Sequence, residues 1–155
     1  MVFNARAAVY GFIALLSIIG IGIAFSSMGG YYEHASQTPY ERLITVGGTP
    51  FKVDVADTPA ERERGLSNTP PQPPRAMLFI FDYDEQWGIW MKDMNYPIDV
   101  LWITADLQVV QIEPNMHPAS FPRVYRASIP VRYVLELPGG TIEAYNLAVG
   151  NQVVL

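Results

Sequence analysis

The segment 90–103 constrains the fold of this chain more than any other part of the sequence. It ends in the run 99–103, Asp-Val-Leu-Trp-Ile, which has the length of a strand and is apolar on both faces except at Asp99. A strand that is apolar on both faces is buried on both sides, so we expect the residues after Pro97 to lie in the core. A carboxylate in that setting is costly unless it is paired or has a function.

Short apolar or alternating runs separated by turn signals continue along the chain, and only two short helices are expected. One helix should span 59–64, with Thr58 as its N-cap and Glu61 completing a capping box, and the other should be capped by Thr141. This pattern predicts a mostly β fold, a sandwich or jelly-roll-like, partly open barrel with one or two short helices. The expected strands cover 43–46, 51–55, 76–81, 88–91, 99–104, 107–112, 132–137 and 152–155.

Two further expectations concern charged residues beside these strands. In the run 51–55 the apolar residues should face the core, which leaves Lys52 and Asp54 facing water. The acidic segment 82–85 should form a solvated turn after the strand 76–81.

An uncharged segment precedes the β domain. Residues 7–28 contain no charge, and about 20 apolar residues are enough for a helix to cross a bilayer. We therefore expect a transmembrane signal anchor at 1–28, a linker at 29–40 and a β domain at 41–155. Positive charge before the segment places the amino terminus in the cytoplasm and the domain outside a single-pass cell membrane protein. If 1–28 is instead a cleaved signal peptide, the domain is secreted or periplasmic.

Composition narrows the classes of chemistry. The net charge is −5 and no basic patch occurs, which argues against nucleic-acid binding. There is no cysteine, which excludes disulfides and thiol nucleophiles, and the chain has only two histidines, so no metal site is predicted. No phosphate-binding loop, dinucleotide fingerprint or serine nucleophile elbow is present, so no cofactor is predicted.

Several short motifs occur in the order known from one family. They are Glu61-Arg62 with Gly65-Leu66, then 77–81 (MLFIF), Trp90-Met91-Lys92, 97–103 (PIDVLWI), Val109-Val110, 133–137 (YVLEL) and Gly150. With these motifs the domain resembles the DUF192 family, also called UPF0127, of uncharacterised and often exported proteins. The resemblance implies a jelly-roll type of β-sandwich and no established activity.

The chain departs from the family pattern at two places. Ser67-Asn68 stands where the family usually has Met and Arg, and Asp93-Met94 stands where it usually has Asn and Thr. If either segment shapes a ligand site, the resemblance implies a different ligand for this chain.

Two isolated carboxylates are the candidates for chemistry. Asp99 and Glu136 each interrupt an apolar strand, and Arg62 and Lys92 are the natural cationic partners. One interpretation is a polar cluster in a cleft, in which a carboxylate acts as a general base or binds a polar ligand. The other is a structural ion pair that holds the helix on the sheet.

The aromatic and sulfur-containing residues form a second candidate group. Aromatic rings beside a cleft can stack on sugar rings, whereas the alternative is core packing with methionine filling gaps. Core packing is predicted for Trp90 and Trp102, and Trp87 is expected to be the exposed indole. The candidate ligand-binding residues are Trp87, Trp90, Met91, Lys92, Arg62 and Asp99.

Two hypotheses about function follow. The first is a membrane-anchored extracytoplasmic binding or accessory module of the cell envelope, whose partner is a glycan, an envelope component or a protein. The alternative is a small exported hydrolase that uses Asp99 or Glu136 with Lys92. A solvent-connected pocket with two carboxylates would favour the hydrolase, and a filled interior with paired carboxylates would favour the module.

Overall fold

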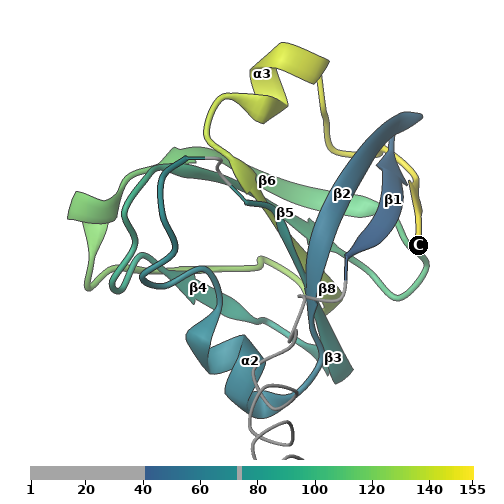
Figure 1. Ribbon diagram of the computed structural model, residues 1–155. Helices are drawn as coiled ribbons and strands as arrows, with labels where there is room; N and C mark the ends of the chain where they lie inside the picture. The colour runs from purple at the N-terminus through teal and green to yellow at the C-terminus, as the bar shows by residue number, and fades with distance from the viewer. Residues whose placement is uncertain (1–40, 73–74) are drawn as a thin grey trace, which may run out of the picture. The chain divides into compact units, whose positions relative to one another are not determined.

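The computed structural model describes residues 41–72 and 75–155 (Figure 1). The expected anchor and linker at 1–40 lie outside these residues, and within the described ranges no helix is long and apolar enough to cross a membrane. The strands are β1 (Arg42–Val46), β2 (Thr49–Ala56), β3 (Met77–Glu85), β4 (Gly88–Trp90), β5 (Ile98–Ile103), β6 (Val109–Met116), β7 (Val124–Arg126), β8 (Val131–Pro138) and β9 (Val153–Val154). The helices are α2 (Pro59–Arg64), α3 (Thr141–Tyr145) and the 3₁₀ turn η1 (Pro118–Ser120). The predicted mostly β fold with two short helices is confirmed.

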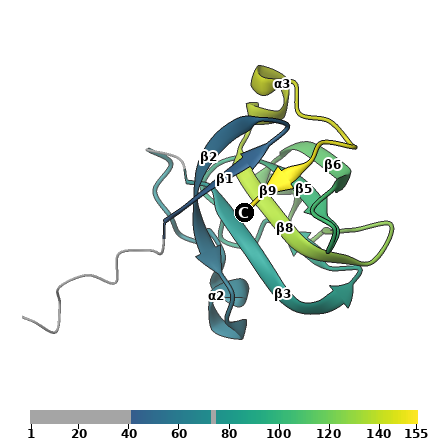
Figure 2. The same cartoon turned by 90° about the vertical axis from the view of Figure 1, so that its right-hand side faces the viewer.

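Seven of the strands form one curled sheet, in the order β6-β5-β8-β3-β2-β1-β9. The β2–β3 pair is parallel and the other pairs are antiparallel. The two edges of the sheet approach each other, because Gln108 and Gln152 form an antiparallel bridge and the Val153 amide donates to the Leu107 carbonyl over 2.8 Å. The result is a half-barrel, seen most clearly in Figure 2. Strands β4 and β7 form a separate two-stranded sheet.

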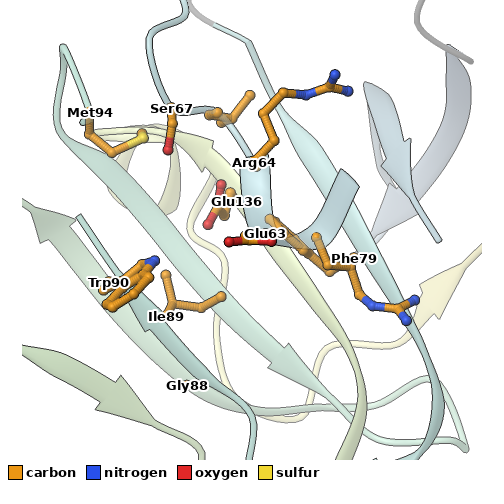
Figure 3. Close-up of a pocket in the computed structure, with 12 residues that line it drawn as sticks. Glu63, Arg64, Ser67, Phe79, Gly88, Ile89, Trp90, Met94 and Glu136 are labelled. Carbon is orange, nitrogen blue, oxygen red and sulfur yellow. The ribbon is translucent and has the colours of Figure 1, made fainter. Parts of the chain in front are cut away.

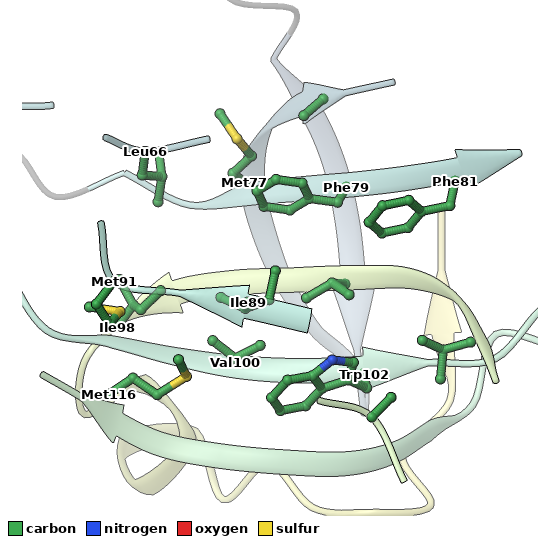
Figure 4. Close-up of a cluster of buried hydrophobic side chains, with 14 of the residues drawn as sticks. Leu66, Met77, Phe79, Phe81, Ile89, Met91, Ile98, Val100, Trp102 and Met116 are labelled. Carbon is green, nitrogen blue, oxygen red and sulfur yellow. The ribbon is translucent and has the colours of Figure 1, made fainter. Parts of the chain in front are cut away.

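The sheet separates two hydrophobic clusters, since successive residues of a strand point to opposite faces. One cluster fills the inside of the curl and receives side chains from both edge strands and from α3. The other lies on the outer face, where β4 and the segment after α2 cover β3, β5 and β8 (Figure 4). Trp102 is fully buried in the outer cluster, which confirms the expectation that the residues after Pro97 are core.

Charged residues near β2 and β3 differ from expectation. Asp54 is 6% exposed and forms an ion pair with Arg75, so the prediction that it faces water was wrong. The acidic segment 82–85 is the end of β3 and not a turn, because β3 continues past a register shift to pair Glu85 with Val131 of β8. Strand geometry there lets the carboxylate of Asp84 accept a hydrogen bond from Arg132 over 2.6 Å.

The capping box of α2 is present as predicted. The Glu61 amide donates to the Thr58 hydroxyl oxygen over 3.3 Å, and the Glu61 carboxylate accepts from the Thr58 amide over 3.0 Å. The Thr58 hydroxyl also donates to this carboxylate, and these bonds lower the pKa of Glu61 from its ordinary value. The cap fixes the start of a helix whose later residues form one wall of the pocket described below.

Replacing Thr58 by alanine is expected to lower the free energy of unfolding by about 1 kcal/mol, because the first turn of α2 loses its side-chain acceptor. Urea denaturation of Thr58→Ala and of the unchanged protein measures this difference. Thr58→Ser keeps the hydroxyl and serves as the control. An equal loss in both variants would show that the hydroxyl is not responsible.

Candidate functional site

Asp99 is a buried acceptor for backbone amides. It is fully buried, and its two carboxylate oxygens accept from the amides of Asn115 and Ile142, each over 2.7 Å. Ile142 lies in the first turn of α3, whose N-cap residue Gly140 has no side chain to offer. The prediction that Thr141 caps this helix was wrong, because its hydroxyl donates to the Pro138 carbonyl. Asp99, 43 residues earlier in the chain, supplies the missing acceptor instead.

Asp99 and Glu136 lie on opposite faces of the sheet. In the β5–β8 pair, Val100 is opposite Glu136 and Asp99 is opposite Leu137. Paired residues share a face, so Glu136 points to the outer cluster with Val100, while Asp99 points inside the curl with Leu137. The first of the two interpretations, one polar cluster containing both carboxylates, is therefore wrong.

The two predicted cationic partners also bind elsewhere. Arg62 does hold the helix on the sheet, but through β3: it lies 3.5 Å from the Asp82 carboxylate and donates to the Ile80 carbonyl over 2.7 Å. Lys92 is exposed, and its ammonium nitrogen lies 5.8 Å from the centre of the Trp90 ring. Among the residues that the structure describes, no ion pair includes Asp99 or Glu136.

Glu136 forms the floor of a small pocket on the outer face. It is 5% exposed, and its Oε2 atom has no hydrogen-bond partner in the described part of the chain. The pocket has a volume of about 60 Å³ and opens to solvent between α2 and β4 (Figure 3). Besides Arg62, Gly65 and Gly88, the residues around it are Glu63, Arg64, Leu66 and Ser67 from α2 and the segment after it, Phe79 from β3, and Ile89, Trp90 and Met94 from β4 and the loop after it.

Burial determines the protonation of this carboxyl group. Loss of hydration raises the pKa of Glu136 to about 8, so the group is largely neutral at pH 7. The guanidinium of Arg62 is held by Asp82 and the backbone, and Figure 3 shows the side chain of Arg64 directed away from Glu136. The neutral group can both donate and accept a hydrogen bond, and in this setting a ligand can supply its missing partner.

The aromatic candidates separate into core and rim. Trp87 is half-buried and stacks on Phe81 with ring centres 4.0 Å apart, and Met91 is 1% exposed in the core. Trp90 is 47% exposed at the rim of the pocket, so the prediction that it is core was wrong. The reason is the alternation of β4, in which Ile89 takes the inward position.

Of the predicted site residues, the structure brings Arg62, Trp90 and Glu136 to this pocket and leaves the others elsewhere. Sequence reasoning missed Glu63, because a charged residue on a short helix looks like part of a solvated face. Ser67 and Met94 carried a usable signal, since both stand where the chain departs from the family pattern and both line the pocket. No group of three or more His, Asp and Glu side chains converges in the ranges 41–72 and 75–155.

Comparison with known proteins agrees with this architecture. The sequence model of the DUF192 family, described as "Uncharacterized ACR", matches residues 42–155. A crystal structure of a protein from Sinorhizobium meliloti 1021, described as a candidate transcription regulator, is similar at 27% identity and a TM-score of 0.69, covering 77% of this chain and 97% of that one. A protein of unknown function from Novosphingobium aromaticivorans DSM 12444 is similar at 26% identity and a TM-score of 0.70, covering 79% of this chain and 90% of that one. No curated protein matches the sequence.

Proposed function

Since the chain belongs to the DUF192 family, whose function is uncharacterised, we propose that it is a membrane-anchored, extracytoplasmic binding module that receives its ligand in the Glu136 pocket. The observation that carries this proposal is the buried Glu136 Oε2 atom without a hydrogen-bond partner. Buried polar atoms in proteins are nearly always paired, so an unpaired carboxyl oxygen at the floor of an open pocket calls for an external partner. A half-exposed indole, Trp90, stands at the rim to contact the rest of the ligand.

The proposed location rests on the sequence. Residues 7–28 carry no charge and are long enough to cross a bilayer, with Arg6 before them and Glu33 as the first charge after them. The partners that suit this location are a glycan, an envelope component or another envelope protein. The chain's net charge of −5 disfavours a nucleic-acid partner.

The pocket favours binding over the alternative, hydrolysis. The hydrolase hypothesis uses Asp99 or Glu136 with Lys92, but Asp99 lies on the other face of the sheet and Lys92 does not line the pocket. Glu63 and Glu136 do share the pocket, which is a feature expected of a hydrolase. However, about 60 Å³ admits only the terminal group of a ligand, whereas sites that enclose whole small molecules are roughly 300–1,000 Å³. A bond between two larger groups would not reach the Glu136 carboxyl.

A screen of glycans and envelope fragments against residues 39–155, which form one compact unit, tests the binding function. We expect at least one ligand to raise the unfolding temperature, and Trp90→Ala to weaken its binding about tenfold through loss of the aromatic contact. Trp90→Ala should itself unfold near the temperature of the unchanged protein, because the side chain is half-exposed. Lys92→Ala, beside the same rim, should weaken binding less.

Tyr145→Ala is the matched control, because Tyr145 is an aromatic residue on α3 that is 55% exposed and does not line the pocket. It should leave ligand binding unchanged. A ligand whose binding is equally weakened by Tyr145→Ala, or by neither variant, would place the site elsewhere. A protease-protection assay on spheroplasts tests the location, and a domain that resists external protease until the spheroplasts are lysed would contradict it.

A further inference from the structure

Three oxygen-bearing side chains line the Glu136 pocket, with Glu136 buried at its floor and Glu63 exposed at its α2 wall. Figure 3 shows the carboxylate of Glu63 and the hydroxyl of Ser67 directed toward the carboxyl group of Glu136. The Ser67 hydroxyl donates its hydrogen to the Lys92 carbonyl over 2.9 Å, so its oxygen is free to accept from a ligand. The pocket therefore offers acceptors from three residues, and a group with several N–H donors on one atom can donate to all of them.

The cations around the pocket do not satisfy these acceptors. Among the lining residues, α2 carries Arg62 and Arg64, while the lining residues of β3 and β4 are uncharged. Arg62 is bound to Asp82 and to backbone carbonyls, and Arg64 is directed away from the floor. Lys92, which follows β4, lies over the Trp90 ring outside the pocket. The acidic floor thus lacks a facing cation within the described residues.

The walls and the volume determine what kind of cation fits. Part of the wall is apolar and comes from Leu66, Phe79, Ile89 and Met94, with Trp90 at the rim. About 60 Å³ holds an ammonium group and the methylene group next to it. A bare metal ion would leave the apolar part of the wall without contacts. An unbranched alkyl chain fills the walls and places its ammonium group at the floor.

On the basis of the binding function proposed above, we propose that the pocket receives a primary alkylammonium group, whose nitrogen donates to Glu136, Glu63 and Ser67. Charge-assisted hydrogen bonds of this kind are about twice as strong as those between neutral groups, and the ligand supplies the partner that the Glu136 Oε2 atom lacks. The same group occurs in free diamines and in lysine side chains of polypeptides.

Proton release distinguishes an ammonium ligand from a neutral one. Glu136 is neutral below pH 8 in the free protein, and a neighbouring ammonium group stabilises its ionised form. Binding at pH 6.5 therefore transfers the Glu136 proton to the buffer, about one proton for each ligand, while the ligand keeps its own charge. Above pH 8 the carboxyl is already ionised and this release disappears. A neutral alcohol would release none.

Isothermal titration of the full chain in nonionic detergent tests the proposal, with n-butylamine as the probe and n-butanol as its neutral counterpart. At pH 6.5 we expect n-butylamine to bind and n-butanol not to bind. The binding enthalpy should differ between phosphate and MOPS buffers by the amount that corresponds to about one released proton. Glu136→Gln should lower the affinity for n-butylamine at least about tenfold, and Glu63→Gln should lower it less.

The matched control is Glu41→Gln, because Glu41 is an exposed glutamate that does not line the pocket, and its affinity should be unchanged. Two further probes separate the sources of the amine. Cadaverine binding more tightly than Nα-acetyl-lysine amide points to a free diamine, and the reverse order points to a lysine side chain of a polypeptide.

Equal binding of n-butanol, absence of proton release, or an unchanged affinity in Glu136→Gln would each overturn the ammonium proposal. Its failure is distinct from failure of the binding function. If amines do not bind but a screened ligand still depends on Trp90 and Glu136, only the ammonium proposal is overturned. If neither an amine nor any screened ligand depends on these residues, both proposals are overturned.

Discussion

Replacing Asp99 by alanine should lower the free energy of unfolding by about 4 kcal/mol and, in a chain of this size, leave a much smaller folded population at 37 °C. The substitution removes the acceptor of two backbone amides, those of Asn115 and Ile142. Each buried amide that loses its acceptor costs about 1–3 kcal/mol of folding free energy, and the substitution leaves two such amides. It also opens a cavity inside the curled sheet at a fully buried position.

Urea denaturation followed by tryptophan fluorescence measures this loss. Asp99→Asn keeps one acceptor oxygen but turns an amide donor toward a second donor, so it should retain only part of the stability. Asp106→Ala is the control, because Asp106 is an exposed turn residue and its substitution should stay within about 0.5 kcal/mol of the unchanged protein. A loss below about 1 kcal/mol for Asp99→Ala would show that Asp99 does not hold α3 on the sheet. A stable Asp99→Ala protein that no longer binds ligand would instead show that Asp99 contributes to ligand binding.

Replacing Glu136 by glutamine should raise the free energy of unfolding, and the size of this gain should depend strongly on pH. Burial raises the pKa of Glu136 to about 8 in the folded protein, compared with 4.5 for an ordinary glutamate. Between these two values the folded state binds more protons than the unfolded state, so the unchanged protein loses stability as the pH rises from 4.5 to 8. Glutamine does not titrate and is not subject to this loss.

We therefore expect Glu136→Gln to match the unchanged protein near pH 4 and to exceed its stability increasingly above that. The difference should grow by roughly 1.4 kcal/mol for each pH unit, reach about 4 kcal/mol near pH 8 and level off above it. Urea denaturation at five pH values measures the difference, and Glu41→Gln should show none of this dependence. A flat difference across the same range would mean that Glu136 is ionised in the folded protein at neutral pH.

A stabilising Glu136→Gln substitution would also bear on function. A residue that lowers stability at neutral pH, and that is buried without a hydrogen-bond partner in the described part of the chain, is more easily explained by a ligand than by the fold. Together with loss of ligand binding in the same variant, this result would separate a site residue from a structural one. Asp99 should show the reverse, a loss of stability.

Local features of the fold were predictable because they depend on neighbours in the sequence. The capping box of Thr58 and Glu61 involves residues three positions apart, and it forms as the sequence indicates. The apolar run 99–103 likewise predicts a buried strand, whichever strands lie next to it in the sheet. The DUF192 membership rested on such local motifs in their order along residues 42–155.

The candidate site was only partly predictable. Asp99 and Glu136 were both found as carboxylates in apolar strands, but their relation depends on the register between β5 and β8, which places Val100 and not Asp99 opposite Glu136. The exposure of Trp90 depends on which face of the short strand β4 packs on the sheet. Neither the register between β5 and β8 nor the packed face of β4 can be derived from a pattern of adjacent residues.

The sequence by itself determined which residues form strands and which side chains are too polar for their surroundings, because alternation and capping act over a few residues. Only the tertiary structure decided what becomes of those polar side chains. Asp99 meets the amides of α3 inside the curled sheet and is satisfied there, whereas Glu136 faces a small open pocket and is not. The physical reason is that the partner of a buried polar side chain is set by strand pairing across the sheet, which joins residues far apart in the chain.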